Sequence, residues 1–189
     1  MPSYQADSPA LCGGLLLFYR RTMASDPILA VPPIEACFVD APPIAAEVAR
    51  GVTRLFCRHD LFAMCEVPLP NGRRADLMAV GPRGELTIVE IKVSRADLLG
   101  DQKWVDYLDY CDRFFWAVPQ SLAALLDDPR FLPGEAGLLV ADRYDAAVIR
   151  EPTTRPLAPA RRKAETLRFA RRAARRLSAQ VDPSLGDSN

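Results

Sequence analysis

The chain has 189 residues, 49% of them apolar, and its 24 basic residues balance 24 acidic ones. This length and apolar content indicate one globular domain with tails. The five cysteines form no CxxC pair and His59 is the only histidine, which argues against a zinc site and favours reduced, buried thiols in a cytoplasmic protein.

The N-terminal segment is irregular and rich in proline, and we expect residues 1–40 to form a flexible arm. Its apolar run, Cys12–Phe18, is too short to cross a membrane. Basic residues follow this run, whereas in a signal peptide they precede it. We therefore expect no membrane partner. Met23 offers an alternative start of translation, which would make residues 1–22 an over-extended gene start.

Residues 41–180 are predicted to form one domain that begins with a helix and three strands. Apolar residues recur with a helical period at positions 44, 48, 52, 55 and 56. Three strands follow, separated by turn sequences, at 62–69, 74–80 and 86–93. The third strand is almost continuously apolar, which indicates burial on both of its faces.

The second half of the domain is predicted to alternate between helices and short strands. A helix is expected over about 98–112, with Trp104, Leu108 and Cys111 on its inner face. The remaining elements are strands at 113–118, 137–141 and 146–149, a short helix at 120–127 and a long helix at 159–180. This order indicates an α/β domain, which residues 181–189 follow as a tail.

Two charged residues interrupt the third predicted strand, which reads ELTIVEIKVS from Glu85 to Ser94. Glu90 and Lys92 are two residues apart, so their side chains point to the same face of the strand. A buried charge is costly unless another group pairs with it. The two charges are explained either by a buried Glu–Lys ion pair or by a catalytic site.

Asp76 on the second strand completes a pattern of an aspartate, a hairpin and then Glu-x-Lys. Because a tight turn joins the two strands, Asp76 can lie near Glu90. Two converging carboxylates form a hard oxygen site that suits Mg²⁺ or Mn²⁺, and the backbone carbonyl of Ile91 is a candidate third ligand. Lys92 would then orient the attacking water or stabilise the charge that develops on a phosphodiester.

This pattern resembles the PD-(D/E)xK nuclease superfamily, which includes restriction endonucleases and archaeal Holliday-junction resolvases. The resemblance implies an α/β fold with a restriction endonuclease-like three-layer core, in which helices flank a mixed β-sheet. It gives Asp76, Glu90 and Lys92 the catalytic places and implies phosphodiester hydrolysis with a divalent metal.

The same resemblance implies further residues around the site. An outer carboxylate often joins the metal ligands, and Glu47 on the first helix and Glu66 on the first strand compete for this place. Many members also carry a Gln-x-x-x-Tyr pair on the helix after the Glu-x-Lys strand. Here Gln102 and Tyr107 are five residues apart, and Lys103 and Tyr107 have the spacing of four.

A wider resemblance covers residues 44–177 and rests on several sequence blocks: Arg73–Asp76, Ile88–Lys92, Asp101–Trp104, Tyr107–Arg113, Ala136–Arg143, Ala160–Lys163 and Leu167–Ala170. Together these blocks are similar to the MmcB-like DNA repair proteins of α-proteobacteria. That family implies a DNA repair endonuclease with the fold described above. We expect a nucleoid-associated protein whose partners are DNA and other repair proteins.

Family membership by itself does not establish catalysis, because one fold hosts different functions. The alternative is a non-catalytic DNA-binding or adaptor protein in DNA repair that retains the nuclease fold. A weaker alternative is a structural dimerisation module. Homodimers are frequent in this fold, but the sequence selects no oligomeric state.

The C-terminal part of the chain is strongly basic. Residues 150–176 hold ten basic and two acidic residues, which leaves 14 basic and 22 acidic residues in the rest of the chain. A basic helix on an acidic body can bind a polyanion although the net charge is zero. The DNA-binding candidates are Arg73, Arg74, Lys103, Arg161, Arg162, Lys163 and Arg168. A solvated helix face is the alternative interpretation of the residues on the last helix.

The last helix also carries apolar residues at steps of three or four, namely Ala160, Ala164, Leu167, Ala170, Ala174 and Leu177. This spacing predicts an apolar stripe that docks the helix on the body. Trp104 and Trp116 are predicted to belong to the core, and Ser94 and Asp97 to cap the helix that follows the Glu-x-Lys strand.

Overall fold

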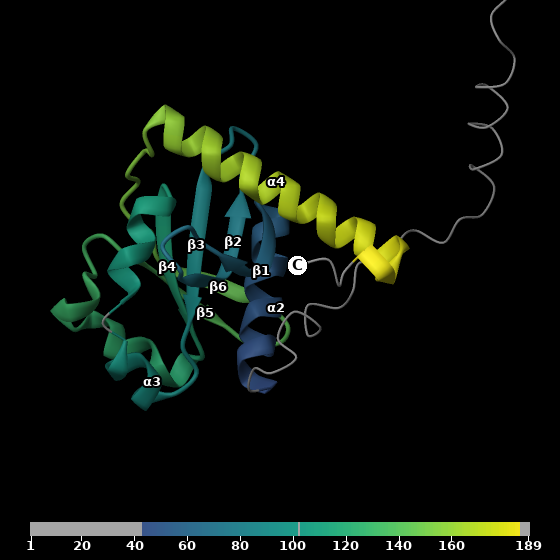
Figure 1. Cartoon of the computed structure of the whole chain (residues 1–189). Coiled ribbons are helices and arrows are strands. Elements are labelled where there is room, and N and C mark those ends of the chain that lie inside the picture. Colours follow the sequence, from purple (N-terminus) through teal and green to yellow (C-terminus); the bar gives the residue numbers. More distant parts are fainter. Residues whose placement is uncertain (1–42, 102, 186–189) are drawn as a thin grey trace, which may run out of the picture. The chain divides into compact units, whose positions relative to one another are not determined.

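The computed structural model describes residues 43–101 and 103–185, which form a mixed six-stranded sheet with helices on both faces (Figure 1). The strands lie side by side in sequence order: β1 Phe62–Pro68, β2 Arg74–Val80, β3 Leu86–Ile91, β4 Arg113–Val118, β5 Gly137–Ala141 and β6 Ala146–Arg150. The predicted three-layer arrangement of a mixed sheet between helices is therefore confirmed.

β3 is one of the two strands in the middle of the sheet. It pairs antiparallel with β2 and parallel with β4, while β1–β2 and β5–β6 are antiparallel pairs and β4–β5 is parallel. All six residues of β3 are buried. The continuous apolar run in the sequence predicted this burial, since a strand that is covered on both faces needs apolar residues at successive positions.

Helix α2 (Pro43–Arg58) covers one face of the sheet. Val48, Val52 and Phe56 point inward from it, as the helical spacing predicted. Phe56 meets Phe115 of β4 edge-on, with ring centroids 6.4 Å apart. This helix packs on every second residue of the strands, among them Leu77, Val89, Ile91, Ala117 and Leu139.

The other face carries the remaining helices: α3 (Arg95–Gly100), the 3-10 helices η2 (Trp104–Tyr110), η3 (Gln120–Asp127) and η4 (Pro129–Phe131), and the long helix α4 (Pro159–Val181). A last 3-10 turn, η5 (Pro183–Leu185), follows α4. Trp116 of β4 lies at the centre of this layer, 5.3 Å from the ring of Trp104 and 5.6 Å from that of Phe131. Both tryptophans are buried in the core, as predicted.

The single helix predicted over 98–112 is wrong, because α3 ends at Gly100 and η2 begins only at Trp104. A 3-10 helix has three residues per turn, so residues three apart share a face. Trp104, Tyr107 and Tyr110 are accordingly the buried residues of η2, and the predicted Leu108 is only partly buried.

The start of α3 agrees with the sequence. Ser94 is its N-cap, and the Ser94 hydroxyl oxygen accepts a hydrogen bond from the Asp97 backbone N–H at 3.1 Å. The early end of α3 leaves Asp101 in extended backbone. From this position its carboxylate reaches Lys92 at the end of β3.

Helix α4 turns its predicted apolar stripe outward, so the expected docking through this stripe is wrong. Leu167 and Leu177 are 57% and 51% exposed. The buried residues of α4 are Glu165 and Phe169 instead. Figure 1 shows this helix running across the sheet, and its inner row of side chains is mostly polar.

An internal ion pair accounts for this rotation of α4. Arg162, in its first turns, binds both carboxylate oxygens of Asp112, a residue with only 2% of its side chain exposed. The Asp112 carboxylate also accepts from the backbone N–H groups of Leu86 at 2.7 Å and Leu157 at 2.8 Å. A carboxylate so buried needs these partners, which fixes the side of α4 that faces the body.

Several predictions concern residues that the structure does not describe, including the flexible arm, the alternative start at Met23 and Gln102. Among the described cysteines, Cys65 and Cys111 are buried free thiols as expected, whereas Cys57 is exposed. Within residues 43–101 and 103–185, no helix is long and apolar enough to cross a membrane.

The packing of α4 can be tested with two substitutions on this helix. Phe169→Ala should lower the free energy of unfolding by about 3 kcal/mol, because it leaves a cavity against the sheet. Leu177→Ala should change it by less than about 0.5 kcal/mol, because this side chain faces solvent. Urea denaturation of both variants measures the difference. Equal losses would contradict the orientation of α4.

Candidate functional site

Asp76 and Glu90 lie at neighbouring positions of β2 and β3, as predicted. The register pairs Leu77 with Val89, so Asp76 and Glu90 come directly after this pair. The Asp76 carboxylate oxygen Oδ2 accepts a hydrogen bond from the Ile91 backbone N–H at 2.8 Å. The aspartate therefore holds the two strands together where their regular pairing ends.

Lys92 is buried among carboxylates, with 8% of its side chain exposed. Its Nζ lies 3.1 Å from Glu90 Oε1, 2.9 Å from Asp101 Oδ2 and 3.7 Å from Asp97 Oδ1. The charges that interrupt the apolar strand are thus paired, but in a network rather than in a simple Glu–Lys pair. Of its members, Asp97 was predicted only as part of a helix cap.

The two carboxyl groups are disposed to hold protons in the free protein. Burial raises the pKa of Glu90 from 4.5 to about 8, and the charge of Asp76 adds to this effect. Burial also raises the pKa of Asp76 from 3.8 to about 6, although the Ile91 N–H and Lys92 act in the opposite direction. The pocket therefore has more acidic groups than Lys92 alone can neutralise.

These residues fit a hard divalent cation. Glu90 Oε2 is buried and has no hydrogen-bond partner in the described part of the chain. Residues 43–101 and 103–185 contain no group of three or more His, Cys, Asp or Glu side chains that could hold a metal. Magnesium does not require such a group, since it is usually bound by one or two carboxylates together with waters and substrate phosphates.

The two candidates for an outer carboxylate lie in different places. Glu66 of β1 has a left-handed backbone (φ 53°), forms an ion pair with Arg74, and its charge acts on the pKa of Asp76. Glu47 of α2 forms an ion pair with Arg143 in the β5–β6 turn. The structure therefore brings Glu66 to the site and holds Glu47 away from it.

An open cleft of about 500 Å³ gives access to Glu90 and Lys92. Lys103 and Tyr107, the pair with a spacing of four, both line this cleft. The Tyr107 hydroxyl donates to the Arg74 carbonyl at 3.1 Å. Burial and then the carboxylates of Glu90, Asp76 and Asp101 raise the pKa of this hydroxyl. It consequently remains a hydrogen-bond donor at neutral pH.

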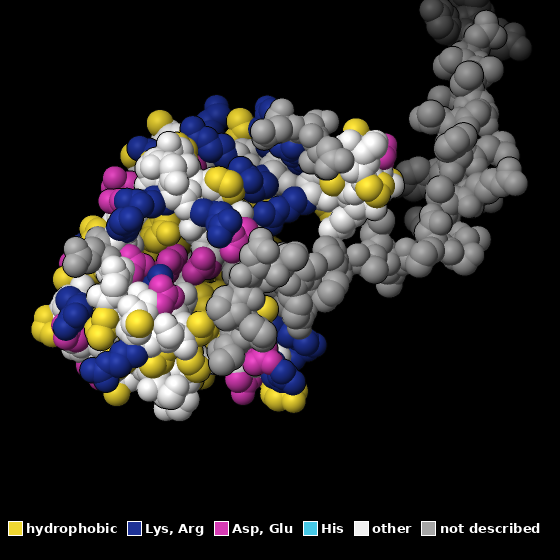
Figure 2. Space-filling model, turned by 60° about the horizontal axis from the view of Figure 1, so that its bottom comes forward, with side chains coloured by type: hydrophobic (Ala, Val, Ile, Leu, Met, Phe, Trp, Pro, Cys, Tyr) yellow, Lys and Arg dark blue, Asp and Glu magenta, His cyan; other side chains and the backbone are white. Residues whose placement is uncertain are grey.

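Acidic side chains gather in the middle of one face of the molecule, bordered by Lys and Arg side chains (Figure 2). Two of the predicted DNA-binding residues are engaged with acids near the cleft: Arg73 binds Asp106 through two nitrogens at 2.9 and 2.8 Å, and Arg74 binds Glu66. Lys103 has no ion pair within the described residues and is the cation at the rim that is open to a ligand.

The four predicted DNA-binding residues of α4 differ in their surroundings. Arg162 is committed to the buried Asp112, and Lys163 is exposed. Arg168 binds Glu165 at 2.5 Å, while Arg161 lies 3.7 Å from the same carboxylate and over the ring of Tyr110. A sequence pattern of basic residues does not separate these cases, because only the rotation of the helix assigns each residue its partner.

The raised pKa values predict that stability falls as pH rises. With a chelator present, the native state binds more protons than the unfolded state between about pH 5 and pH 8, so the free energy of unfolding should drop by on the order of 3 kcal/mol across this range. In Glu90→Gln, the drop should end near the pKa of Asp76, about 6. Urea denaturation at a series of pH values measures both curves. A wild-type curve that is flat above pH 6 would contradict the assignment to Glu90.

Three comparisons with known proteins bear on the identity of this domain. A family model described as DNA repair protein MmcB-like matches residues 38–184. The chain is also similar to the solved structure of the SPO1766 protein of unknown function from Silicibacter pomeroyi, with 46% identity and a TM-score of 0.68 over 77% of this chain and 95% of that chain. A search of curated proteins found no match. Because the family match spans nearly the whole described domain, the chain belongs to the MmcB-like DNA repair protein family.

Proposed function

We propose that the chain is a metal-dependent DNA endonuclease of the PD-(D/E)xK type that hydrolyses phosphodiester bonds during DNA repair. The observation that supports this most directly is that Asp76 lies beside Glu90, while Glu90 and Lys92 line the open cleft and Glu90 Oε2 is buried and unpartnered among the described residues. Membership of a DNA repair family supports DNA as the substrate.

In this proposal Asp76 and Glu90 hold Mg²⁺ or Mn²⁺, and the Ile91 carbonyl and Glu66 are the further candidate ligands. The bound ion would lower the pKa of a water and neutralise charge on the phosphate. A site with two carboxylates leaves coordination positions for water and for phosphate oxygens. The preference of Glu90 and Asp76 for protons in the free protein means that a cation would compete with those protons.

Lys92 acts as a charged donor in this scheme. Burial lowers its pKa, but the Glu90 carboxylate and Asp101 raise it more, so the overall shift is upward. The ammonium group therefore stays protonated at neutral pH and does not act as a base. It can orient a water molecule by hydrogen bonding, and it can stabilise negative charge on a phosphate oxygen. Asp101 fixes its position at 2.9 Å.

The cleft gives the remaining residues a place in substrate binding. Lys103 at its rim is positioned to contact a backbone phosphate, and the Tyr107 hydroxyl remains a donor beside the carboxylates. Contacts to phosphate carry no direct sequence information. Phosphate contacts from Lys103 and its neighbours would therefore favour recognition of DNA structure over DNA sequence.

The proposed activity predicts metal-dependent cleavage that is lost in three variants. Wild-type protein should cut at least one of a panel of labelled linear, nicked and branched DNAs in Mg²⁺ or Mn²⁺ at low salt. Asp76→Asn, Glu90→Gln and Lys92→Ala should each lower the rate by roughly 100-fold or more, because each removes a charged group from the reacting centre. Gel analysis of the products measures the rates.

Two further variants complete the cleavage experiment. Glu66→Gln should reduce the rate if Glu66 is the outer carboxylate, and Glu47→Gln distinguishes the competing assignment. Glu151→Gln, an exposed residue away from the cleft, is the matched control. Cleavage that persists undiminished in Asp76→Asn or Lys92→Ala would refute the assigned mechanism.

A non-catalytic DNA-binding or adaptor protein is the second candidate function. It is favoured by the ion pairs that Lys92 makes with Glu90 and Asp101 and by the lack of a three-residue metal cluster within the described residues. Such a protein would bind DNA without a divalent ion, and Asp76 would not contribute to its activity.

Metal affinity separates the two candidates. If the pair of carboxylates holds a cation, saturating Mn²⁺ at pH 8 should raise the Tm of the wild type by several degrees, because a ligand at about 100 times its Kd contributes about 2.7 kcal/mol. Glu90→Gln should show no such shift. Differential scanning calorimetry measures both proteins, and an unchanged Tm of the wild type would favour the adaptor.

A further inference from the structure

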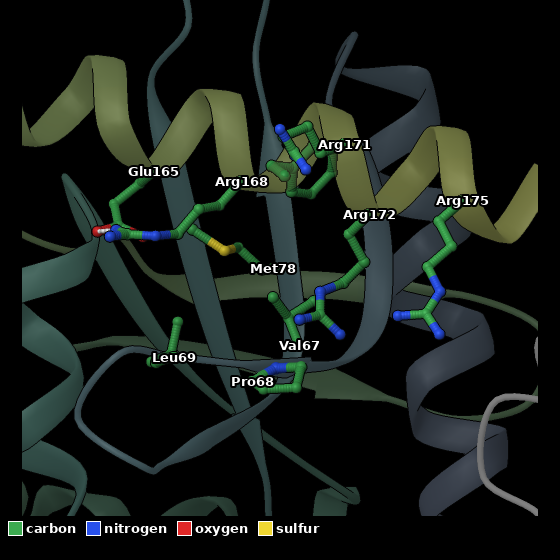
Figure 3. A pocket seen from close by; sticks show the side chains of 10 residues that line it. Val67, Pro68, Leu69, Met78, Glu165, Arg168, Arg171, Arg172 and Arg175 are labelled. Atoms are coloured by element: carbon green, nitrogen blue, oxygen red, sulfur yellow. Dashed lines mark hydrogen bonds and ion pairs between the residues drawn. The ribbon is translucent and has the colours of Figure 1, made fainter. Parts of the chain in front are cut away.

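A second pocket lies between α4 and the strands β1 and β2, and it has a volume of about 360 Å³ (Figure 3). Arginines and one glutamate from α4 form its roof: Glu165, Arg168, Arg171, Arg172 and Arg175. Apolar side chains from the body and the helix form its floor and wall: Val67, Pro68, Leu69, Met78 and Phe169. A cationic roof over an apolar floor is therefore the chemistry of this pocket.

The pocket is lined by four arginines and one glutamate. Figure 3 shows Arg172 and Arg175 extending away from α4, whereas Arg168 lies along the helix and is paired with Glu165. Arg172 is half-buried and makes no hydrogen bond or ion pair with any described residue. Burial first, and then the like charges of Arg176 and Arg175, lower the pKa of Arg172. An anion would relieve this unfavourable arrangement.

The pocket adjoins the candidate active site. Arg176 Nη2, one turn beyond Arg172, donates to the Glu66 carbonyl at 3.2 Å. Val67 in the floor follows Glu66 directly, and Met78 is two residues beyond Asp76 on β2. A polymer bound in the pocket would therefore extend toward the carboxylates of Glu66 and Asp76.

We propose that this pocket binds a single-stranded segment of nucleic acid, with its phosphates at Arg172 and the neighbouring Arg168 and a base against the apolar floor. The inference rests on the proposed function in one respect, since it identifies the substrate of that site as DNA with an unpaired strand, such as a flap, gap or branch. Binding itself requires neither metal nor cleavage.

The shape and composition of the pocket favour a single strand over other polyanions. In a duplex the bases are stacked inside, so no base face is available to an apolar floor, whereas an unpaired base can lie on one. The volume of the pocket is at the lower end of the roughly 300–1,000 Å³ typical of ligand pockets, which suits one nucleotide and not a duplex. An acidic peptide would use the arginines and leave the apolar floor without a matching group.

The test is a binding measurement on the full chain in EDTA, so that cleavage does not contribute. Fluorescence anisotropy with a labelled oligo-dT and with a duplex of the same length should show tighter binding of the single strand, by about tenfold. Arg172→Glu should weaken binding of the single strand by about tenfold or more and lower the slope of log K against log salt by about one or two.

Arg83→Glu, an exposed residue of the β2–β3 turn, is the matched control with the same change of charge. It should alter the single-strand affinity by less than about threefold. Pro68→Ala trims the exposed part of the floor without a change of charge, and it should weaken binding of the single strand more than binding of the duplex. Circular dichroism melting curves establish that each variant is folded at the assay temperature.

The outcomes decide the inference separately from the nuclease assignment. Preferential single-strand binding that Arg172→Glu abolishes and Arg83→Glu preserves supports the pocket, whether or not the protein cuts DNA. Equal or tighter binding of the duplex, or equal losses in the two charge-reversal variants, overturns it in favour of diffuse electrostatic attraction. Polyglutamate and unlabelled oligo-dT are compared as competitors for the labelled oligonucleotide. If both displace it at the same concentration of negative charge, the inference is also overturned, because the pocket would then bind charge alone.

Discussion

The candidate site depends on one buried ammonium group. Lys92 Nζ lies within 3.1 Å of carboxylate oxygens from Glu90 and Asp101, and these contacts link the end of β3 to the segment between α3 and η2. Ion pairs of this kind do not in general make a fold more stable than a well-packed apolar core would. Charges kept in the middle of a sheet are therefore better explained by chemistry than by stability, which is why the proposed function places the reaction here.

A second buried carboxylate has a structural consequence of the same kind. Asp112 gathers two backbone N–H groups and the guanidinium of Arg162, and thereby sets the rotation of α4. With that rotation, Phe169 and a row of arginines face the sheet, and the apolar stripe that includes Leu167 faces solvent. The site and the arginine-roofed pocket consequently lie on the same face of the sheet, and Glu66 lies next to the pocket.

The sequence predicted much of the framework from local patterns. The bounds of β2 and β4 agree with the expected residues, since turn sequences and a change of period mark both ends of each strand. The proximity of Asp76 and Glu90 followed from a short hairpin. The break between α3 and η2 did not follow, because a period of three and a period of 3.6 are indistinguishable over so few residues.

The sequence by itself determined the order of helices and strands, the burial of β3 and the Asp, Glu-x-Lys pattern, because these depend on neighbouring residues and on one tight turn. Only the tertiary structure decided that Glu66 and not Glu47 lies by Asp76, that Asp101 holds Lys92, and which face of α4 meets the body. Each of these depends on contacts between residues far apart in the chain. Local periodicity predicted that the apolar stripe of α4 would face the body. The buried Asp112 carboxylate requires an ion pair with Arg162, which lies far from it in the chain, and this long-range interaction was the stronger constraint.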